Sequence, residues 1–508
     1  MDLQSIVLWL VIGIVSTIFL FFKKRYSYWK DRGAEYVEPT IPYGNLPFWK
    51  KMHTKEILGR IYDKKSGKSP FIGAFFFATP VVIATDLDFI KSVLIKDFSS
   101  FHGRGIFVNE LDDPLSAHLF SLDGEKWKSL RAKLSPTFTS GKMKFMFPTV
   151  VEVADRFNAS LAELVTERAT MEIRDLLARF TTDVIGTCAF GIECNSMKTP
   201  NSEFRRYGSR AFDDPAHSTL LQVFSFQYPN LAKKYFHMRV FKKDVTDFFM
   251  DTVRGTIAFR EKNNVRRNDF MDLLIQLKNG GLLEDEHSKK LGKLTIEEVA
   301  AQAFLFFIAG FETSSTTMMF ALHELSLNPD IQEKARQEID EVLRKHDGKI
   351  TYESIEEMVY VDRIISETLR KYPAAPNLLR KCTQDFNVPN SEVIIEKDTI
   401  VFIPAYSIHH DPEIYDNPEV FDPDRFSPEQ IKNRHPVAFL GFGDGPRNCV
   451  GLRFGRMQSR IGLVTLLKNY RFKPSAKTRM PMEYVEGNPL LSLKHGIYLI
   501  VEKLQIGG

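Results

Sequence analysis

The sequence predicts a mainly α-helical protein with small β-sheets, preceded by a single N-terminal transmembrane helix. Three observations carry this prediction: an uncharged apolar segment near the N-terminus, helical spacing of apolar residues from about position 123 to 345, and short apolar runs before and after that region. The 508 residues can bury a large core. A net charge of only +4 argues against a nucleic-acid-binding protein.

The first element is the apolar segment from Ser5 to Phe22, which is long enough to cross a ~30 Å hydrocarbon layer as a helix. Lys23, Lys24 and Arg25 follow it directly, and no A-x-A cleavage pattern is present. We therefore expect residues 1–25 to form an uncleaved signal anchor. Because the positively charged residues that flank a membrane helix stay in the cytosol, the remaining chain is expected on the cytosolic side. A cleaved secretory signal is the alternative interpretation.

After the anchor, residues 26–50 are predicted to form a proline-rich linker, because Pro39, Pro42 and Pro47 exclude regular helix there. Residues 51–508 are expected to form one catalytic domain. Phe71–Phe77 and Val81–Ala84, separated by Pro80, predict two paired strands, and a further strand is expected at Ile497–Val501.

The clearest helix is predicted to begin after Thr295, whose hydroxyl can cap the first turn while Glu298 completes a capping box. It should continue to about Leu327, a length of roughly 50 Å. Asn328 and Pro329 then end it and open another helix. A helix so long and apolar must run through the body of the protein.

The main candidate for a metal-ligating residue is Cys449, in the segment FGDGPRNCVG that begins at Phe442. A metal-ligating cysteine must be a thiolate, which the start of a following helix stabilises. Gly443, Gly445 and Gly451 would allow tight turns and a close backbone approach to a flat ligand. A buried structural cysteine is the ordinary alternative. However, the pattern F-x-x-G-x-R-x-C-x-G should occur by chance in only about one chain in ten thousand.

This segment resembles the haem-binding loop of the cytochrome P-450 superfamily, and the likeness extends over nearly the whole chain. Narrower stretches, such as those around Phe101–Gly105, Asp112–Leu119 and Cys449–Met457, resemble insect family-six microsomal members. The resemblance implies the cytochrome P-450 fold and a haem b cofactor whose iron is ligated by Cys449. It also implies monooxygenase activity that uses O2 and NADPH-derived electrons.

A second motif, AGFET, lies at Ala309–Thr313 in the middle of the long helix. Cleaving the O–O bond of O2 needs protons, so Glu312 and Thr313 on an otherwise apolar face are expected to act as catalytic acid and alcohol. Gly310 should leave room for oxygen beside the helix, and the Thr313 hydroxyl can bond the carbonyl one turn back. A kinked helix with a satisfied threonine is the alternative. The motif closely matches the oxygen-activation motif of the resembling family.

The resemblance assigns further residues by position. Glu367, Arg370 and Arg425 are expected to form a structural charge cluster. The predicted cofactor-binding residues are Trp127, Arg131, Arg380, Phe442, Arg447 and Gly451. The predicted substrate pocket is lined by Ile106, Phe107, Phe120, Leu305, Ile308, Ala309, Leu378 and Leu490. An apolar, aromatic lining of this kind suits small lipophilic substrates.

The resemblance also implies partners and a location: NADPH-cytochrome reductase, with cytochrome b5 as a second candidate, at the endoplasmic reticulum membrane with the catalytic domain facing the cytosol. No nucleic-acid partner is expected. The residues Lys126, Lys128, Lys133, Arg453, Arg456 and Arg460 are candidates for a basic docking face or simply a solvated one. The aromatic stretch Val223–Phe236 is expected at the membrane surface, with an interior loop as the alternative.

The sequence is compatible with several functions. Detoxification of xenobiotics, insecticides or plant toxins is the expectation, and hydroxylation of endogenous hormones or lipids is the alternative. A non-catalytic haem-thiolate sensor or an O2-independent hydroperoxide-rearranging enzyme would have less use for Glu312 and Thr313. A non-haem iron enzyme would need His409, His410 and Asp411 to converge on one metal, which adjacent residues rarely do.

Overall fold

The computed structural model describes residues 2–47, 51–267, 269–280 and 292–505. These residues form two compact units, each built from several segments of the chain. The first unit comprises Met1–Gly105, Pro376–Asp416 and His435–Arg447. The second comprises Ile106–Ala375, Asn417–Arg434 and Asn448–Gly508.

The first unit contains the N-terminal helix and two small sheets. Its elements are α1 (Leu3–Tyr26), η1 (Lys30–Arg32), α2 (Thr54–Tyr62), β1 (Phe71–Phe76), β2 (Thr79–Ala84), α3 (Leu87–Lys91), η2 (Ser92–Lys96), η3 (Phe98–Ser100), β4 (Leu378–Lys381), β5 (Phe386–Asn387), β6 (Ile394–Ile395), β7 (Ile400–Ile403), α17 (Ala405–His409) and η8 (Gly445–Arg447). The larger sheet has the order β1-β2-β7-β4 and covers a core of aromatic and branched side chains.

The predicted strand pair is confirmed as the antiparallel pair β1 and β2, with Phe71 opposite Ala84. Pro80 was expected to separate the two strands, but this is wrong. It lies inside β2, opposite Phe75. The parallel pairing of β2 with β7 begins only at Val81, so Pro80 is not required to donate to that neighbour. This explains why the strand tolerates a proline.

Helix α1 is confirmed as long and apolar enough to cross a membrane, and none of its candidate span is buried. It extends past the predicted end to Tyr26. The expected linker is also more ordered than its prolines indicated, because Trp29 lies fully buried against the sheet. Positions 48–50 of that linker lie outside the described residues.

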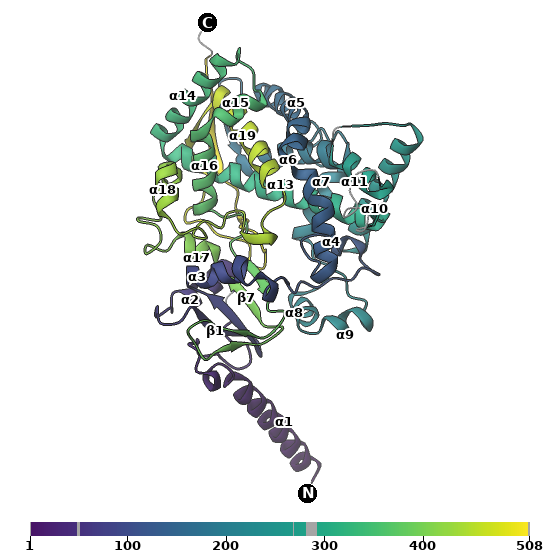
Figure 1. Cartoon of the computed structure of the whole chain (residues 1–508), viewed down its shortest axis with the longest axis vertical. Helices are drawn as coiled ribbons and strands as arrows, with labels where there is room; N and C mark the ends of the chain where they lie inside the picture. The colour runs from purple at the N-terminus through teal and green to yellow at the C-terminus, as the bar shows by residue number, and fades with distance from the viewer. Residues whose placement is uncertain (1, 48–50, 268, 281–291, 506–508) are drawn as a thin grey trace. The chain divides into compact units, whose positions relative to one another are not determined.

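The second unit is mainly helical (Figure 1). Its elements are η4 (Pro114–Ser116), α4 (Gly124–Leu134), η5 (Ser135–Phe138), α5 (Ser140–Leu164), β3 (Arg168–Glu172), α6 (Ile173–Ile185), η6 (Gly186–Phe190), α7 (Glu203–Asp213), α8 (Thr219–Gln227), α9 (Pro229–Lys234), α10 (Lys243–Lys262), α11 (Phe270–Asn279), α13 (Ile296–Leu327), α14 (Pro329–Lys345), α15 (Tyr352–Glu357), α16 (Val359–Lys371), η7 (Pro423–Phe426), α18 (Pro428–Asn433), α19 (Leu452–Asn469), β8 (Tyr470–Pro474) and β9 (Tyr498–Lys503).

Helix α13 is the central element of this unit, as predicted. Thr295 accepts from the Glu298 amide, and the Glu298 carboxylate accepts in return, which confirms the capping box. The helix ends at Leu327, and Pro329 opens α14. It packs against α6, α10, α16 and α19, so the side chains at its middle lie in the interior of this unit. The C-terminal strand expected at Ile497–Val501 is β9, which begins one residue later and ends two residues later than expected, and it is paired between β3 and β8.

Candidate functional site

The loop around Cys449 is shaped by two glycines in left-handed backbone conformations. Gly443 has φ of 67° and Gly445 has φ of 72°. A Cβ atom on Gly445 would lie 1.9 Å from the carbonyl oxygen of Leu94, so no larger residue fits. Gly451, in contrast, has φ of −87° at the N-cap of α19. Gly451 thus lies in a turn whose backbone conformation does not itself require glycine, and its cofactor-binding role stays a prediction.

Cys449 is solvent-accessible although it lies two residues after the buried Arg447. Helix α19 begins at Leu452, as the sequence predicted, so the thiol sits just before a helix N-terminus. Amide groups at such a terminus stabilise a negative charge. The position therefore suits a thiolate ligand better than a packed structural cysteine.

Arg131 of α4 lies close to Cys449 within the second unit. Its guanidinium donates to the carbonyl oxygen of Asn448 at 3.1 Å and to the Asn448 side-chain oxygen at 2.8 Å. Burial lowers the pKa of Arg131, and the negative charge of Cys449 opposes that shift. Trp127, one helical turn earlier, is buried on the same helix. The structure thus brings a cationic donor next to the candidate ligand.

The remaining predicted cofactor residues, Arg380, Phe442 and Arg447, belong to the first unit. Arg447 donates from Nε to the His102 carbonyl oxygen at 2.6 Å, and Arg104 donates to the Arg447 carbonyl oxygen at 3.2 Å. Arg380 lies in β4, where Nη1 donates to its neighbour's carbonyl oxygen at 2.9 Å. Both arginines are almost fully buried, whereas Phe442 is half-buried. Their positions are fixed by the backbone around them.

The middle of α13 contains an accessible patch in an otherwise buried stretch. Ala309 is exposed and Thr313 is half-buried, while Ile308 and Phe311 are buried. The Thr313 hydroxyl donates to the Ala309 carbonyl oxygen at 2.5 Å, as predicted. The room left by Gly310 is not a notch for a ligand, because Ile185 of α6 fills it: a Cβ atom there would lie 2.5 Å from that side chain.

Glu312 faces a charged hollow in the second unit. Its carboxylate pairs with Arg174 of α6 at 2.9 Å. The hollow has a volume of about 220 Å³, and its charged lining also includes Asp175, Arg205 and Asp213. Thr313 does not line it. Glu312 and Thr313 are thus adjacent in the chain but present their polar groups to different surroundings.

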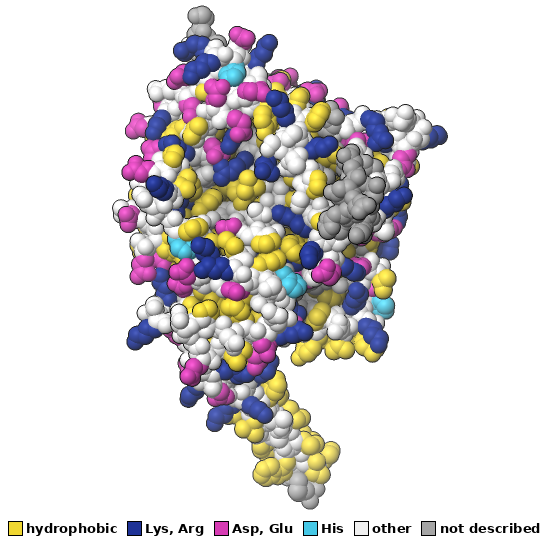
Figure 2. Space-filling view, viewed as in Figure 1, with side chains coloured by type: hydrophobic (Ala, Val, Ile, Leu, Met, Phe, Trp, Pro, Cys, Tyr) yellow, Lys and Arg dark blue, Asp and Glu magenta, His cyan; other side chains and the backbone are white. Residues whose placement is uncertain are grey.

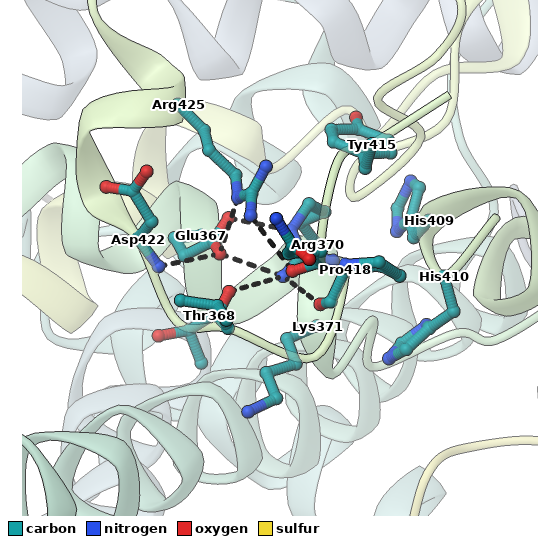
Figure 3. A network of polar contacts seen from close by, with 12 residues as sticks. Glu367, Thr368, Arg370, Lys371, His409, His410, Tyr415, Pro418, Asp422 and Arg425 are labelled. Atoms are coloured by element: carbon teal, nitrogen blue, oxygen red, sulfur yellow. Dashed lines mark hydrogen bonds and ion pairs between the residues drawn. The ribbon is translucent and has the colours of Figure 1, made fainter. Parts of the chain in front are cut away.

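The predicted charge cluster is brought together around Glu367 (Figure 3). Arg370 makes two bonds to the Glu367 carboxylate, at 2.7 and 2.8 Å, and Arg425 lies 3.5 Å from it. The Asp422 amide also donates to Glu367 at 3.0 Å, and Arg370 donates to the Pro418 carbonyl oxygen at 2.7 Å. Burial raises the pKa of Glu367, and the Arg370 hydrogen bonds and charge oppose that shift. The cluster ties α16 to the segment before η7.

The eight predicted substrate-pocket residues differ in exposure. Phe107, Leu305 and Ile308 are buried; Ile106, Leu378 and Leu490 are half-buried; Phe120 and Ala309 are exposed. None of them lines the charged hollow. Phe107 packs against Ala232 and Met238, near α9, which links the start of the second unit to its aromatic stretch. The pocket itself stays a prediction.

That aromatic stretch folds as α8 and α9, and four of its large apolar side chains are exposed: Tyr228, Leu231, Tyr235 and Phe236.

Several residues of the predicted basic face already form ion pairs with carboxylates of this chain. Lys126 pairs with Glu110 at 2.7 Å, and both Arg456 and Arg460 pair with Asp362 at 2.5 and 2.7 Å. Ion pairing therefore reduces the net positive charge that this set can present to a partner.

The histidine-based metal site is not formed. His409 accepts from the Leu440 amide at 2.9 Å, and His410 stacks on Tyr406. Asp411 accepts from the Tyr62 hydroxyl at 2.7 Å and pairs with Lys65. Throughout the part of the chain that the structure describes, no group of three or more His, Cys, Asp or Glu side chains could hold a metal ion. This removes the basis for a non-haem iron centre at this motif.

Sequence reasoning missed Arg174, the partner of Glu312. The two residues lie 138 positions apart, and the residues around Arg174 contain no recognisable motif. Only its place in the first turn of α6, which packs along α13, brings the guanidinium to the carboxylate.

Comparisons with known proteins show which family the chain resembles over nearly its whole length. A family model described as Cytochrome P450 matches residues 38–501. Cytochrome P450 6a8 of Drosophila melanogaster is 48% identical over 505 residues, covering 99% of this chain and 100% of the relative. Probable cytochrome P450 6a14 of the same organism is 47% identical over 507 residues, covering 97% and 98%. Cytochrome P450 6a2 is 47% identical over 505 residues, covering 98% and 100%.

Proposed function

This chain belongs to the cytochrome P450 family and is a monooxygenase, and on that premise we propose that Cys449 ligates the iron of a haem b at which small lipophilic molecules are oxidised. The observation that carries the proposal is the accessible thiol of Cys449, placed just before α19 and within electrostatic reach of the half-buried Arg131. When bound, the haem supplies the transfer of one oxygen atom from O2 to the substrate.

The donor set present in the chain fits a haem, because it combines one soft ligand with several cationic groups. A thiolate is a suitable axial ligand for haem iron. Arg131, Arg380 and Arg447 are suited to the two propionates, since a guanidinium binds a carboxylate through paired hydrogen bonds. Trp127 adds an indole donor. Phe442 and Gly451 are proposed to lie against the porphyrin, where a flat ring and a small residue fit a flat ligand.

Glu312 and Thr313 are proposed to deliver protons during oxygen activation. The Thr313 hydroxyl donates to the carbonyl oxygen of Ala309, which lies one turn back on α13, and both residues belong to the accessible patch of this helix. Glu312 pairs with Arg174 at the edge of a hollow that can admit water. This arrangement supports a role for Glu312 in taking protons from the solvent side and for Thr313 in presenting one to the reacting oxygen.

The proposed substrates are xenobiotics such as insecticides or plant toxins, with endogenous hormones or lipids as the alternative. The eight predicted pocket residues are all apolar, and such a lining selects mainly by shape and burial. A site with few polar groups discriminates weakly between lipophilic molecules, which suits the removal of varied compounds. We expect an apolar ligand to contact Leu305, Ile308 and Ala309.

Electrons are proposed to come from NADPH through a membrane-bound cytochrome reductase, with cytochrome b5 as a second donor. Helix α1 supports anchoring in a membrane, and we place the protein in the endoplasmic reticulum with both units on the cytosolic side. Lys128, Lys133 and Arg453 are the best candidates for reductase contacts, because Lys126, Arg456 and Arg460 are already paired with carboxylates.

The decisive test is the carbon-monoxide difference spectrum of the reduced, full-length protein in membranes. We expect a Soret maximum at the long wavelength that is characteristic of thiolate ligation. In Cys449→Ala this maximum should disappear, because the iron loses its sulfur ligand. The matched control is Cys194→Ala, which removes a half-buried cysteine outside the site and should leave the maximum unchanged. An unchanged spectrum in Cys449→Ala would rule out the assignment.

A further inference from the structure

A hollow of about 390 Å³ lies at the end of the membrane helix, entirely within the first unit. It is formed where α1 passes into η1, and three cations and one carboxylate are among its lining residues, which are Phe21, Lys24, Arg25, Ser27, Tyr28, Asp31 and Arg32. The Asp31 carboxylate accepts from the Ser27 hydroxyl at 2.6 Å. From its N-terminal end, at the bottom of Figure 2, the helix is apolar and exposed, and Lys and Arg side chains gather at its other end. The hollow therefore lies at the level where an inserted helix leaves the hydrocarbon.

The charge of this region is strongly positive. Lys23, Lys24, Arg25, Lys30 and Arg32 fall within ten positions, and Asp31 is the one acidic residue among them. Arg32 is partly neutralised, since it pairs with Glu396 at 2.5 Å and stacks over Tyr28. Over the described chain, neither Lys24 nor Arg25 forms an ion pair with a carboxylate, although Arg25 donates to the Ala78 carbonyl oxygen at 3.0 Å.

The hollow is held in shape by residues that dock the helix end on the sheet. The Tyr26 ring lies 5.0 Å from the Phe75 ring, and its hydroxyl accepts from the Gly44 amide at 2.9 Å. Trp29 is fully buried and donates to the Ala74 carbonyl oxygen at 3.1 Å. A Cβ atom on Gly73 would lie 2.6 Å from the Trp29 ring, so the indole occupies a groove that only glycine leaves open. The basic residues are therefore fixed in place and do not belong to a loose tail.

We propose that this hollow binds the headgroup of an anionic phospholipid of the membrane in which α1 is anchored. Lys24 and Arg25 would pair with the headgroup phosphate, because both side chains are exposed, neither forms an ion pair within the described chain, and the cations of the lining outnumber its one carboxylate, Asp31. Phe21, at the apolar end of the lining, would lie against the start of the acyl chains. The arrangement of an apolar residue below and two cations above matches an amphiphile better than a free anion.

The proposal rests on insertion of α1 in a bilayer, so its test must report insertion separately. The full-length protein is reconstituted in phosphatidylcholine vesicles containing a trace of spin-labelled phosphatidylcholine or spin-labelled phosphatidylserine. Motional restriction of the phosphatidylcholine label reports that the helix is inserted. The additional restriction of the phosphatidylserine label reports selection for the anionic headgroup.

We expect the protein to prefer phosphatidylserine, and each cation removed from the hollow should weaken the preference roughly fivefold. The double variant Lys24→Gln/Arg25→Gln should therefore lose most of it. Lys23→Gln/Lys30→Gln is the matched control: it removes the same charge from the same ten positions, but neither residue lines the hollow. The control should keep most of the preference.

Three outcomes would overturn the proposal. Equal losses in both double variants would mean that general surface charge attracts the lipid. Loss of selection on adding inorganic phosphate, but not chloride at the same ionic strength, would mean a free-anion site. No restriction of either label would mean that α1 is not inserted, which removes the premise while leaving the haem-thiolate assignment untouched.

Discussion

Two buried glutamates of the second unit pair with arginine, and their surroundings differ. Both side chains of the Glu367–Arg370 pair are fully buried, and the two residues lie one turn apart on α16. In the Glu312–Arg174 pair, the Glu312 side chain is 9% exposed and the Arg174 side chain 30%, and the partners come from α13 and α6. The first pair is closed on all sides, whereas the second opens on a hollow.

The difference separates a structural pair from one that can take part in chemistry. The Glu367 carboxylate is saturated by Arg370, Arg425 and the Asp422 amide, so a proton can reach it only if the cluster opens. Glu312 keeps contact with a hollow that water can enter, which allows exchange of protons with solvent. Burial alone therefore does not identify a functional carboxylate; the route to solvent does.

The largest effect is expected from Arg370→Ala. Removing one partner leaves the Glu367 charge buried without its main counter-ion, which typically costs about 3–5 kcal/mol. The unfolding midpoint of the purified full chain should fall accordingly. Arg363→Ala is the control, because Arg363 is on the same helix but pairs with an exposed carboxylate. Equal losses in the two variants would show that enclosure does not set the strength of the Glu367 pair.

Arg174→Ala should change function more than stability. The pair is partly exposed, so its loss should cost no more than about 1 kcal/mol. Glu312 would lose the group that positions it, and we expect several-fold less product for each NADPH consumed. This is less than the roughly 100-fold loss typical when a proton-transfer group itself is removed. Arg174→Lys should restore most of the coupling. Unchanged coupling in Arg174→Ala would place Glu312 outside the proton route.

Asp113 offers a third arrangement, a buried carboxylate held by neutral donors. It accepts from the amides of Val240 and Phe241, each at 2.9 Å, and from the Thr246 hydroxyl at 3.1 Å. Burial raises the pKa of Asp113 above its ordinary value, against the effect of these donors. The folded state thus holds this proton more tightly than the unfolded state does.

The sign of the pH effect follows from that difference. The contribution of Asp113 to stability is greatest below its unfolded pKa of about 3.8 and declines as pH rises through the folded pKa. Asp113→Asn cannot ionise, so the wild type should lose roughly 1 kcal/mol relative to the variant for each unit of pKa difference. Unfolding midpoints of both proteins between pH 4 and 7 would measure this. Parallel curves would mean that the donors cancel the burial effect.

The smallest effect is expected from Asp424→Ala. Asp424 neighbours Arg425 in η7, but its side chain is 54% exposed, and it pairs with Lys334 at 3.2 Å and Arg363 at 3.0 Å. Exposed pairs contribute at most about 1 kcal/mol, and salt should reduce the contribution further. Thermal unfolding at low and high salt checks this. A loss as large as that of Arg370→Ala would mean that Asp424 is part of the closed cluster.

Local sequence patterns predicted those elements whose cause is local. The capping box at Thr295 and Glu298, the proline that opens α14 and the helix after Cys449 depend on neighbours within a few positions. The Arg174 partner of Glu312 and the burial of Trp29 depend on contacts between distant segments. No periodicity or spacing encodes such contacts, so only the folded chain reveals them.

Gly310 shows a further limit. Its place in the AGFET motif indicated free space beside α13, but a glycine in a helix can equally mark a close approach by a neighbour. The Ile185 side chain occupies that space. The residue type was informative about close packing, and the sequence alone could not say whether the neighbour is a ligand or another helix.

The docking of Trp29 on Gly73 matters for anyone who shortens the chain to obtain a detergent-free protein. Deletion up to Arg25 would remove the apolar helix yet keep the Tyr26 and Trp29 contacts that cover the edge of the sheet. Deletion up to Arg32 would uncover the groove over Gly73 and expose the aromatic side chain of Phe71 beside it. A truncated protein of the second kind should aggregate for a reason unrelated to its membrane segment.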